Sequence, residues 1–286
     1  MMGAGVEPLV EADWLHEHLE DPDLRILDAT VFITPDFSTE SGRAAWERGH
    51  IPGSGFADIL GDLSDPAYPP FMTMAPPAEQ FAVAMSRLGV WDGTRVVIYD
   101  ARENMWAARV WWLLRAFGFD AAAVLDGGWT TWVAEGRPVS TDPPAHPPAT
   151  FVPRPRPHLF VGKADVFAAM DDPDTVIVSA LGRRSHRGEI SEYGRAGHIP
   201  GARNVSAFAV IDKQTQKYLP EPVLRQRFAG ILDAPQIITY CGGAIAACSD
   251  ALVLHLLGHR NVAVYDGSLI EWNSDPTTPI EVGEVT

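Results

Sequence analysis

Cys241 is the residue of this sequence best placed to do chemistry. It follows an apolar run at 236–240 and precedes a segment with helical periodicity. Two consecutive glycines after it let the backbone curl so that amide hydrogens point inward, toward the sulfur. The sequence therefore predicts an anion cradle, which the dipole of the following helix reinforces, and a thiol whose pKa is lowered. The predicted cradle residues are Gly242, Gly243, Ala244, Ile245 and Ala246.

The chain has one other cysteine, Cys248, for which a structural role is expected. It lies about two helical turns after Cys241, on the face of the predicted helix shared with Ala251 and Leu252, and so belongs to the core. Two cysteines are too few for a disulfide scaffold or a four-thiolate site. No spacing of His, Cys and carboxylates resembles a metal site, and we expect neither a metal nor an organic cofactor.

The elements that position Cys241 follow from the apolar pattern. Nearly continuous apolar runs at 95–99 and 236–240 predict fully buried strands. Strands that alternate with helical segments predict an α/β fold, a parallel sheet with helices on both faces. Ligands of such sheets bind beyond the carboxyl ends of the strands, where Cys241 lies. Helices are predicted at 77–88, 105–117, 163–171, 221–231 and 245–257.

The sequence repeats itself once. The segment Gly-His-Ile-Pro-Gly at 49–53 recurs at 197–201, a spacing of 148 residues, and the strand at 95–99 is matched by the strand at 236–240. In each half an Asp-Gly pair follows, with a tryptophan further on, Trp132 or Trp272. Three landmarks in one order predict two similar α/β domains. Because both halves contain the histidine of the first landmark, His50 and His198 are expected to stabilise turns rather than to catalyse.

A proline-rich segment separates the two halves. Residues 138–157 contain eight of the 24 prolines, which cannot donate a regular hydrogen-bond ladder. We therefore predict a first domain at 1–137, a linker at 138–158 and a second domain at 159–286.

These features resemble the tandem-domain rhodanese family of sulfurtransferases, over residues 7 to 283. The resemblance rests on the paired His-Ile-Pro-Gly segments, the Asp-Gly and tryptophan of each half, and the strand, cysteine loop and helix of the second half. It implies two rhodanese-like domains, a catalytic second one and a non-catalytic first one in which Asp100 occupies the place of Cys241. It further implies an enzyme that moves a sulfane sulfur from a small-molecule donor to cyanide or a thiol through a Cys241 persulfide.

The loop departs from both familiar versions of the family pattern. Members that act on thiosulfate typically have basic side chains after the cysteine, and members that act on mercaptopyruvate typically read Cys-Gly-Ser-Gly-Val-Thr. Here Gly243 replaces the serine, and the acid and histidine that accompany it align with Leu60 and Phe71. We therefore expect a thiosulfate sulfurtransferase, with 3-mercaptopyruvate as the alternative donor.

A second departure concerns the donor-binding arginine of the family, which aligns with Ser185. A basic cluster surrounds this position, directly after the strand that ends near Ala180. We predict that substrate is bound by Arg187, Arg184 and Ser185, with Arg187 as the contact to the donor anion. The cluster consists of Arg183, Arg184, His186, Arg187 and Arg195.

Two other functions use similar features. A cysteine-dependent phosphatase needs an arginine six residues after the cysteine to bind two phosphate oxygens, and Ala247 occupies that position. A non-catalytic binding module that kept the fold is the other alternative, because a fold alone does not establish function.

The composition of the chain limits which classes of binding partner are expected. The net charge of −15 argues against nucleic acid, whose phosphates bind through Lys and Arg. No apolar stretch is long enough to span a bilayer, so no membrane partner is expected. The first residues lack a basic and apolar secretory signal, which predicts a cytoplasmic protein.

Overall fold

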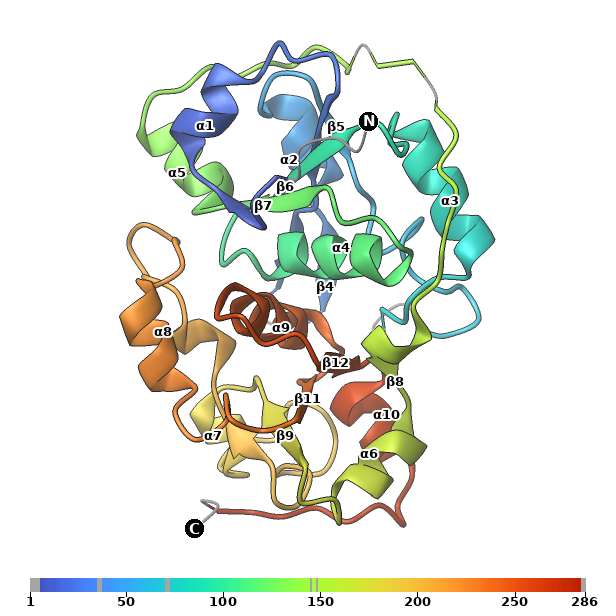
Figure 1. The fold of residues 1–286 in the computed structure, drawn as a ribbon, viewed down its shortest axis with the longest axis vertical. Coiled ribbons are helices and arrows are strands. Elements are labelled where there is room, and N and C mark those ends of the chain that lie inside the picture. The colour runs from blue at the N-terminus through green and yellow to red at the C-terminus, as the bar shows by residue number, and fades with distance from the viewer. Residues whose placement is uncertain (1–5, 35–37, 70–72, 145, 148, 284–286) are drawn as a thin grey trace. The chain divides into compact units, whose positions relative to one another are not determined.

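The chain forms two compact units, each built around its own sheet (Figure 1). The structure is a computed structural model that describes residues 6–34, 38–69, 73–144, 146–147 and 149–283. Unit 1 comprises Met1–Arg156 and Asp212–Tyr218, and unit 2 comprises Pro157–Ile211 and Leu219–Thr286. The predicted α/β class with two similar domains is confirmed.

Unit 1 is organised around five parallel strands in the order β1-β7-β6-β2-β5. These strands are β1 (Leu9–Val10), β2 (Leu24–Asp28), β5 (Ser54–Phe56), β6 (Arg95–Tyr99) and β7 (Ala122–Leu125). A separate antiparallel pair consists of β3 (Val31–Ile33) and β4 (Thr39–Ser41). The helices are α1 (Ala12–Glu17), α2 (Arg43–Arg48), α3 (Ala78–Arg87), α4 (Met105–Ala116) and α5 (Gly128–Ala134). Helix α4 packs against β6 and β7.

Unit 2 repeats this topology. Its five parallel strands have the order β8-β12-β11-β9-β10, which matches the order of unit 1 strand by strand. The strands are β8 (Phe160–Val161), β9 (Thr175–Ser179), β10 (Arg203–Asn204), β11 (Gln236–Tyr240) and β12 (Val262–Tyr265). The α-helices are α6 (Lys163–Ala169), α7 (Arg183–His186), α8 (Glu221–Arg227), α9 (Ile245–Leu256) and α10 (Ser268–Ser274), and short 3-10 helices lie at η2 (Pro157–Leu159) and η3 (Ala207–Ala209). In Figure 1 the strands lie between α9 on one side and α6 and α10 on the other.

The central strand of each unit holds the matching His-Ile-Pro-Gly turn in place. In unit 1 the Tyr99 hydroxyl accepts a hydrogen bond from the Ile51 amide at 3.3 Å. In unit 2 the Tyr240 hydroxyl accepts one from the Ile199 amide at 3.0 Å. The sequence repeat therefore corresponds to one structural contact that is made in both units. In each unit the last tyrosine of the central strand, Tyr99 or Tyr240, binds the turn that precedes the outer strand.

Both turn histidines are buried and hydrogen-bonded to backbone. His50 Nδ1 lies 2.8 Å from the Trp46 carbonyl oxygen, and His198 Nδ1 lies 2.7 Å from that of His186. The rings of His186 and His198 also stack, with centroids 3.8 Å apart. The hydrogen bonds expected of the two turn histidines are therefore present.

The proline-rich segment lies along unit 1. Ser140 pairs with His50 in an isolated antiparallel bridge, and the Arg154 amide donates to the Phe117 carbonyl at 2.7 Å. Residues 212–218 of the second half also belong to unit 1, where the Tyr218 amide donates to Asp126 Oδ1 at 2.8 Å. Nothing in the local sequence pattern indicated this crossing of the chain.

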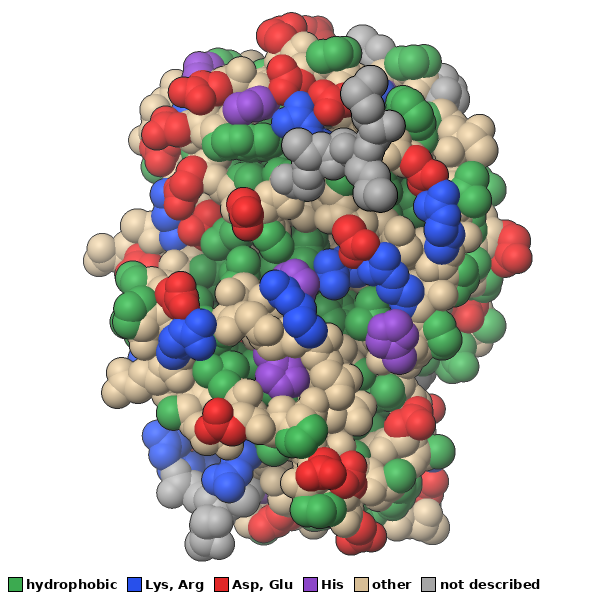
Figure 2. Space-filling view, in the orientation of Figure 1, with side chains coloured by type: hydrophobic (Ala, Val, Ile, Leu, Met, Phe, Trp, Pro, Cys, Tyr) green, Lys and Arg blue, Asp and Glu red, His purple; other side chains and the backbone are tan. Residues whose placement is uncertain are grey.

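The predicted strands at 95–99 and 236–240 are confirmed as β6 and β11, and each predicted helix is present. The helix predicted at 221–231 ends at Arg227, because the chain tightens into turns from Phe228 onward. Within the described ranges, no helix is long and apolar enough to cross a membrane. Figure 2 shows acidic side chains spread over the face in view, in keeping with the net charge of −15.

Candidate active site

Cys241 lies at the carboxyl end of β11, in the short loop before α9, and only 4% of its surface is exposed. Its sulfur accepts hydrogen bonds from the backbone N–H groups of Ala247, Gly243, Ala246 and Gly242. Three of these four donors belong to the predicted cradle. The fourth, Ala247, was missed, although the first amides of any helix lack intrahelical partners and are available to a ligand.

The other two predicted cradle residues have different roles. Ala244 adopts a left-handed conformation with φ of 63°, and its amide donates to Ser268 Oγ at 3.1 Å. Ile245 begins α9 and is not one of the four donors. A left-handed alanine is strained by about 1 kcal/mol or more, so the surrounding contacts must impose the turn.

Ser268 fastens the loop and was not foreseen from the sequence. Its Oγ accepts the amides of Cys241, at 3.2 Å, and of Ala244, and donates to the Tyr265 carbonyl at 2.8 Å. It is fully buried and has a φ of 48°. The matching residue of unit 1 is Gly128, with a φ of 49°. A serine where the repeat has glycine was therefore the signal that could have identified it.

Burial dominates the electrostatics of the thiol. The loss of hydration raises the pKa of Cys241 above its ordinary value, and the four donated amides act in the opposite direction without cancelling it. The prediction of a lowered pKa is therefore wrong for this resting site. It counted the amide dipoles and the helix, and it omitted the cost of removing a thiolate from water.

The same cradle in unit 1 holds a carboxylate. Asp100 occupies the place of Cys241, and its oxygens accept the amides of Asn104 at 3.1 Å, Trp106 at 2.9 Å and Ala107 at 3.0 Å. Burial raises the pKa of Asp100 to about 7 against the opposing effect of these amides. The strand, loop and helix of unit 1 thus direct three backbone amides at the Asp100 carboxyl group, as those of unit 2 direct four at the Cys241 sulfur.

Tyr193 covers the cysteine loop and was also missed. A Cβ added to Gly242 would lie 2.2 Å from Cε1 of the Tyr193 ring, so the ring packs directly on the glycine. The backbone of Tyr193 is held by Asn273, whose Nδ2 donates to its carbonyl at 2.7 Å. Burial, and the negative charge of an ionised Cys241, raise the pKa of Tyr193, so its hydroxyl stays protonated at neutral pH. Gly242 is needed here because any side chain would displace the ring.

The basic cluster is divided among different surroundings. Arg184 is 71% exposed and lies 3.4 Å from Glu189, and Ser185 is buried within α7. Arg187 is 29% exposed, also lies beside Glu189, at 3.5 Å, and lines a pocket of about 720 Å³ together with Arg183. The pocket lining includes neither Cys241 nor the two other predicted substrate-binding residues.

Arg195, the last member of the cluster, is used structurally. Its guanidinium donates to the backbone carbonyls of Thr278 at 2.6 Å and Asp275 at 3.0 Å. Of the two residues aligned with the family's acid and histidine, Leu60 lies in unit 1 and Phe71 lies outside the described residues. Within the part of the chain that the structure describes, no group of three or more His, Cys, Asp or Glu side chains is arranged to hold a metal.

The chain matches the rhodanese-like domain family twice, over residues 11–135 and over residues 165–275. The chain belongs to the tandem-domain rhodanese family of sulfurtransferases. A rhodanese relative from Arabidopsis thaliana, thiosulfate/3-mercaptopyruvate sulfurtransferase 1, is 34% identical over 96% of this chain and 78% of its own. The sulfur carrier protein TtuD of Thermus thermophilus is 34% identical over 97% of this chain and 98% of its own.

A solved structure supports the same membership. The crystal structure of the 3-mercaptopyruvate sulfotransferase SseA from Escherichia coli superposes with a TM-score of 0.82 at 32% identity. The match covers 92% of this chain and 99% of SseA. The similarity to SseA therefore extends over both rhodanese-like domains of this chain.

Proposed function

We propose that this rhodanese takes a sulfur atom from 3-mercaptopyruvate, carries it as a persulfide on Cys241 and passes it to a thiol acceptor. The observation that carries the proposal is a nearly buried thiol that accepts four backbone amides in a loop without a charged side chain. Such a cradle suits a single sulfur atom and stabilises the partial negative charge of a persulfide.

The donor proposed here differs from the thiosulfate expected from the sequence. Thiosulfate carries two negative charges, and the loop of Gly242, Gly243 and Ala244 provides no cation to meet them. The names of relatives point the same way, since the structurally matched E. coli protein is a 3-mercaptopyruvate sulfotransferase and the Arabidopsis name includes both donors. Thiosulfate is therefore the second donor to test.

The first half-reaction balances without an oxidant or a metal. The Cys241 thiol loses its proton, its sulfur bonds to the donor sulfur, and the donor C–S bond breaks with its electron pair on carbon. The resulting enolate takes up one proton and leaves as pyruvate. In the second half-reaction an acceptor thiolate attacks the outer sulfur, which regenerates Cys241. Because burial raises the pKa of the resting thiol, loss of the Cys241 proton is a necessary part of the first half-reaction.

Arg187 is our proposed contact for the donor carboxylate. Of the two arginines beside Glu189, Arg187 is less exposed than Arg184, and its planar guanidinium can form paired hydrogen bonds with a carboxylate. Replacing Arg187 with alanine should raise the KM for the donor by roughly tenfold to a hundredfold, as expected for the loss of a charged hydrogen bond. Arg184 and Ser185 remain predicted substrate-binding residues.

Parallel assays of two donors test the proposal. Pyruvate release from 3-mercaptopyruvate and sulfite release from thiosulfate are measured with the same small thiol acceptor. We expect the kcat/KM for 3-mercaptopyruvate to be the larger, no turnover by Cys241→Ser with either donor, and unchanged turnover by Cys248→Ser. A clear preference for thiosulfate overturns the donor, and turnover by Cys241→Ser overturns the persulfide.

A sulfur carrier is the second candidate function. The observations that favour it are the low exposure of Cys241 and the likeness to a Thermus protein named a sulfur carrier. A carrier would keep its persulfide in the presence of small thiols and release it to a protein. Purified Cys241 persulfide bearing radioactive sulfur, treated with a small thiol, separates the two, because rapid loss of label supports the enzyme and retention supports the carrier.

A further inference from the structure

Unit 2 contains a pocket of about 720 Å³ with a basic lining, of which the proposed reaction uses only Arg187. It lies beside the outer strand β10, between α7 and the end of α8. Four arginines line it, and no carboxylate does. These arginines are Arg183, Arg187, Arg203 and Arg227.

Two of the four arginines form no ion pair with the residues that the structure describes. These two are Arg203 and Arg227, and both residues are exposed to solvent. Arg187 lies beside Glu189, which is outside the pocket. In a chain with 37 acidic and 22 basic residues, a pocket with four arginines and no carboxylate in its lining concentrates positive potential that attracts an anion.

The remaining lining groups are small or neutral and polar. Asn204, Ser206 and Gln226 add hydrogen-bonding groups. Burial lowers the pKa of His186 to about 3, so this ring is neutral at pH 7. Apart from that histidine no aromatic side chain lines the pocket, so it offers no surface on which a nucleobase could stack.

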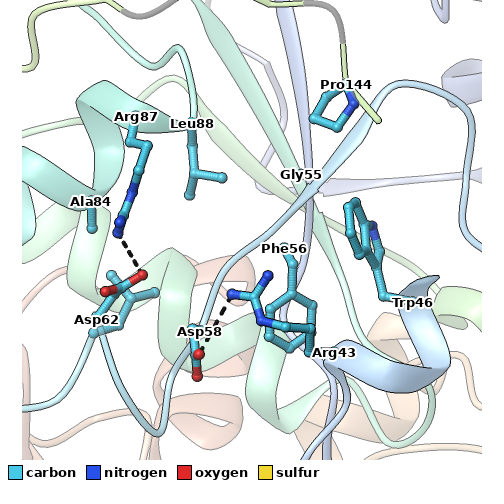
Figure 3. Close-up of a pocket in the computed structure, with 11 residues that line it drawn as sticks. Arg43, Trp46, Gly55, Phe56, Asp58, Asp62, Ala84, Arg87, Leu88 and Pro144 are labelled. Carbon is cyan, nitrogen blue, oxygen red and sulfur yellow. Dashed lines mark hydrogen bonds and ion pairs between the residues drawn. The ribbon is translucent and has the colours of Figure 1, made fainter. Parts of the chain in front are cut away.

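Unit 1 contains a pocket in the matching place, and its charges are already neutralised. This pocket, of about 230 Å³, lies beside the outer strand β5 and α3 (Figure 3). Arg87 forms an ion pair with Asp62 at 2.5 Å, and Arg43 lies 3.6 Å from Asp58. Figure 3 shows both pairs among the lining side chains. Each cation of this pocket therefore has a carboxylate beside it.

The repeat shows how the two pockets came to differ. The spacing of 148 residues between the His-Ile-Pro-Gly motifs matches Gly55 with Arg203 and Asp58 with Ser206, and all four residues line their respective pockets. At these two positions unit 2 has an arginine in place of a glycine and a hydroxyl in place of a carboxylate. Both differences make the pocket of unit 2 more positive than its counterpart.

We propose that this pocket of unit 2 binds a small polyanion that carries phosphate or carboxylate groups. Guanidinium groups match both through paired hydrogen bonds, and a volume of this size fits a small molecule. The pocket lies near the carboxyl ends of β9 and β10, where parallel sheets bind ligands. The acidic surface of the chain disfavours the long polyanion of a nucleic acid. Arg187 is shared with the proposed donor contact, whereas Arg183, Arg203 and Arg227 have no part in the proposed sulfur transfer.

Calorimetric titration with inorganic pyrophosphate and, separately, with citrate at fixed ionic strength tests the site. We expect at least one of them to bind with 1:1 stoichiometry, and the preferred anion identifies phosphate or carboxylate as the recognised group. Arg203→Ala and Arg227→Ala should each weaken binding by about tenfold or more, the loss expected for one charged hydrogen bond. Arg203→Lys should weaken it less, because the charge stays and the planar fork is lost.

Matched controls separate this site from the rest of the chain. Arg87→Ala, in the pocket of unit 1, should leave anion binding unchanged, and so should Cys241→Ser, which removes sulfur transfer. Arg187 is left intact because it is the proposed donor contact. Absence of binding by wild type, equal affinity of wild type and both alanine variants, or an equal loss in Arg87→Ala each overturns the proposal.

Discussion

Replacing Gly242 with alanine should force the Tyr193 ring off the cysteine loop and destabilise unit 2. The new Cβ would lie 2.2 Å from Cε1 and 2.3 Å from Cζ of the ring. Carbon atoms in contact are about 3.5–4.0 Å apart, so the ring must move by more than about 1 Å. Gly242 does not have a positive φ, so the steric overlap accounts for the whole expected effect.

Overlap of this kind costs about 1–3 kcal/mol in the free energy of unfolding. Urea unfolding of wild type, Gly242→Ala, Tyr193→Ala and the double variant measures it as a coupling energy. In the Tyr193→Ala background, Gly242→Ala should cost less than about 0.5 kcal/mol, because the ring that it would strike is gone.

Gly61→Ala is the matched control. Its Cβ would lie no closer than 3.4 Å to the Asp58 side chain, an ordinary contact, so its cost should stay within about 0.5 kcal/mol. If Gly242→Ala cost the same with and without the Tyr193 ring, the ring would not be what excludes a side chain at position 242.

Three further predictions concern the two cradles. Donor treatment should add one sulfur, about 32 Da, to Cys241 and none to Cys248, as peptide mass spectrometry would show, and labelling at Cys248 would contradict the site. Alkylation of Cys241 by iodoacetamide should have its pH midpoint above the ordinary thiol value of about 8.5, because burial raises the pKa of this thiol; a midpoint below that value would mean that the amides prevail. Asp100 has a pKa of about 7 in the folded chain, above the value of about 3.9 expected when unfolded, so the folded state binds more protons and stability should fall as pH rises from 5 to 8. The fall due to Asp100 should be about 2–3 kcal/mol and should be missing in Asp100→Asn, as urea unfolding at both pH values would reveal.

Much of the fold could be predicted from the sequence because its determinants are local or repeated. Continuous apolar runs identified β6 and β11, and periodic segments identified the long helices α4 and α9. The glycines after Cys241 predicted an inward-facing set of amides, three of which donate to the sulfur. Each of these inferences needs only a few consecutive residues and the geometry of a strand followed by a helix.

The tertiary structure alone decided the features that depend on distant residues and on burial. Ser268, which lies 27 residues after Cys241, holds the cysteine loop through hydrogen bonds. Tyr193, which precedes the loop in the chain, covers the same loop with its ring. Arg203 and Arg227 join α7 in one pocket because β10 pairs with β9 and α8 packs nearby. The direction of the Cys241 pKa shift also needed the fold, because local amides favour the thiolate while the surrounding chain removes the water that would stabilise it.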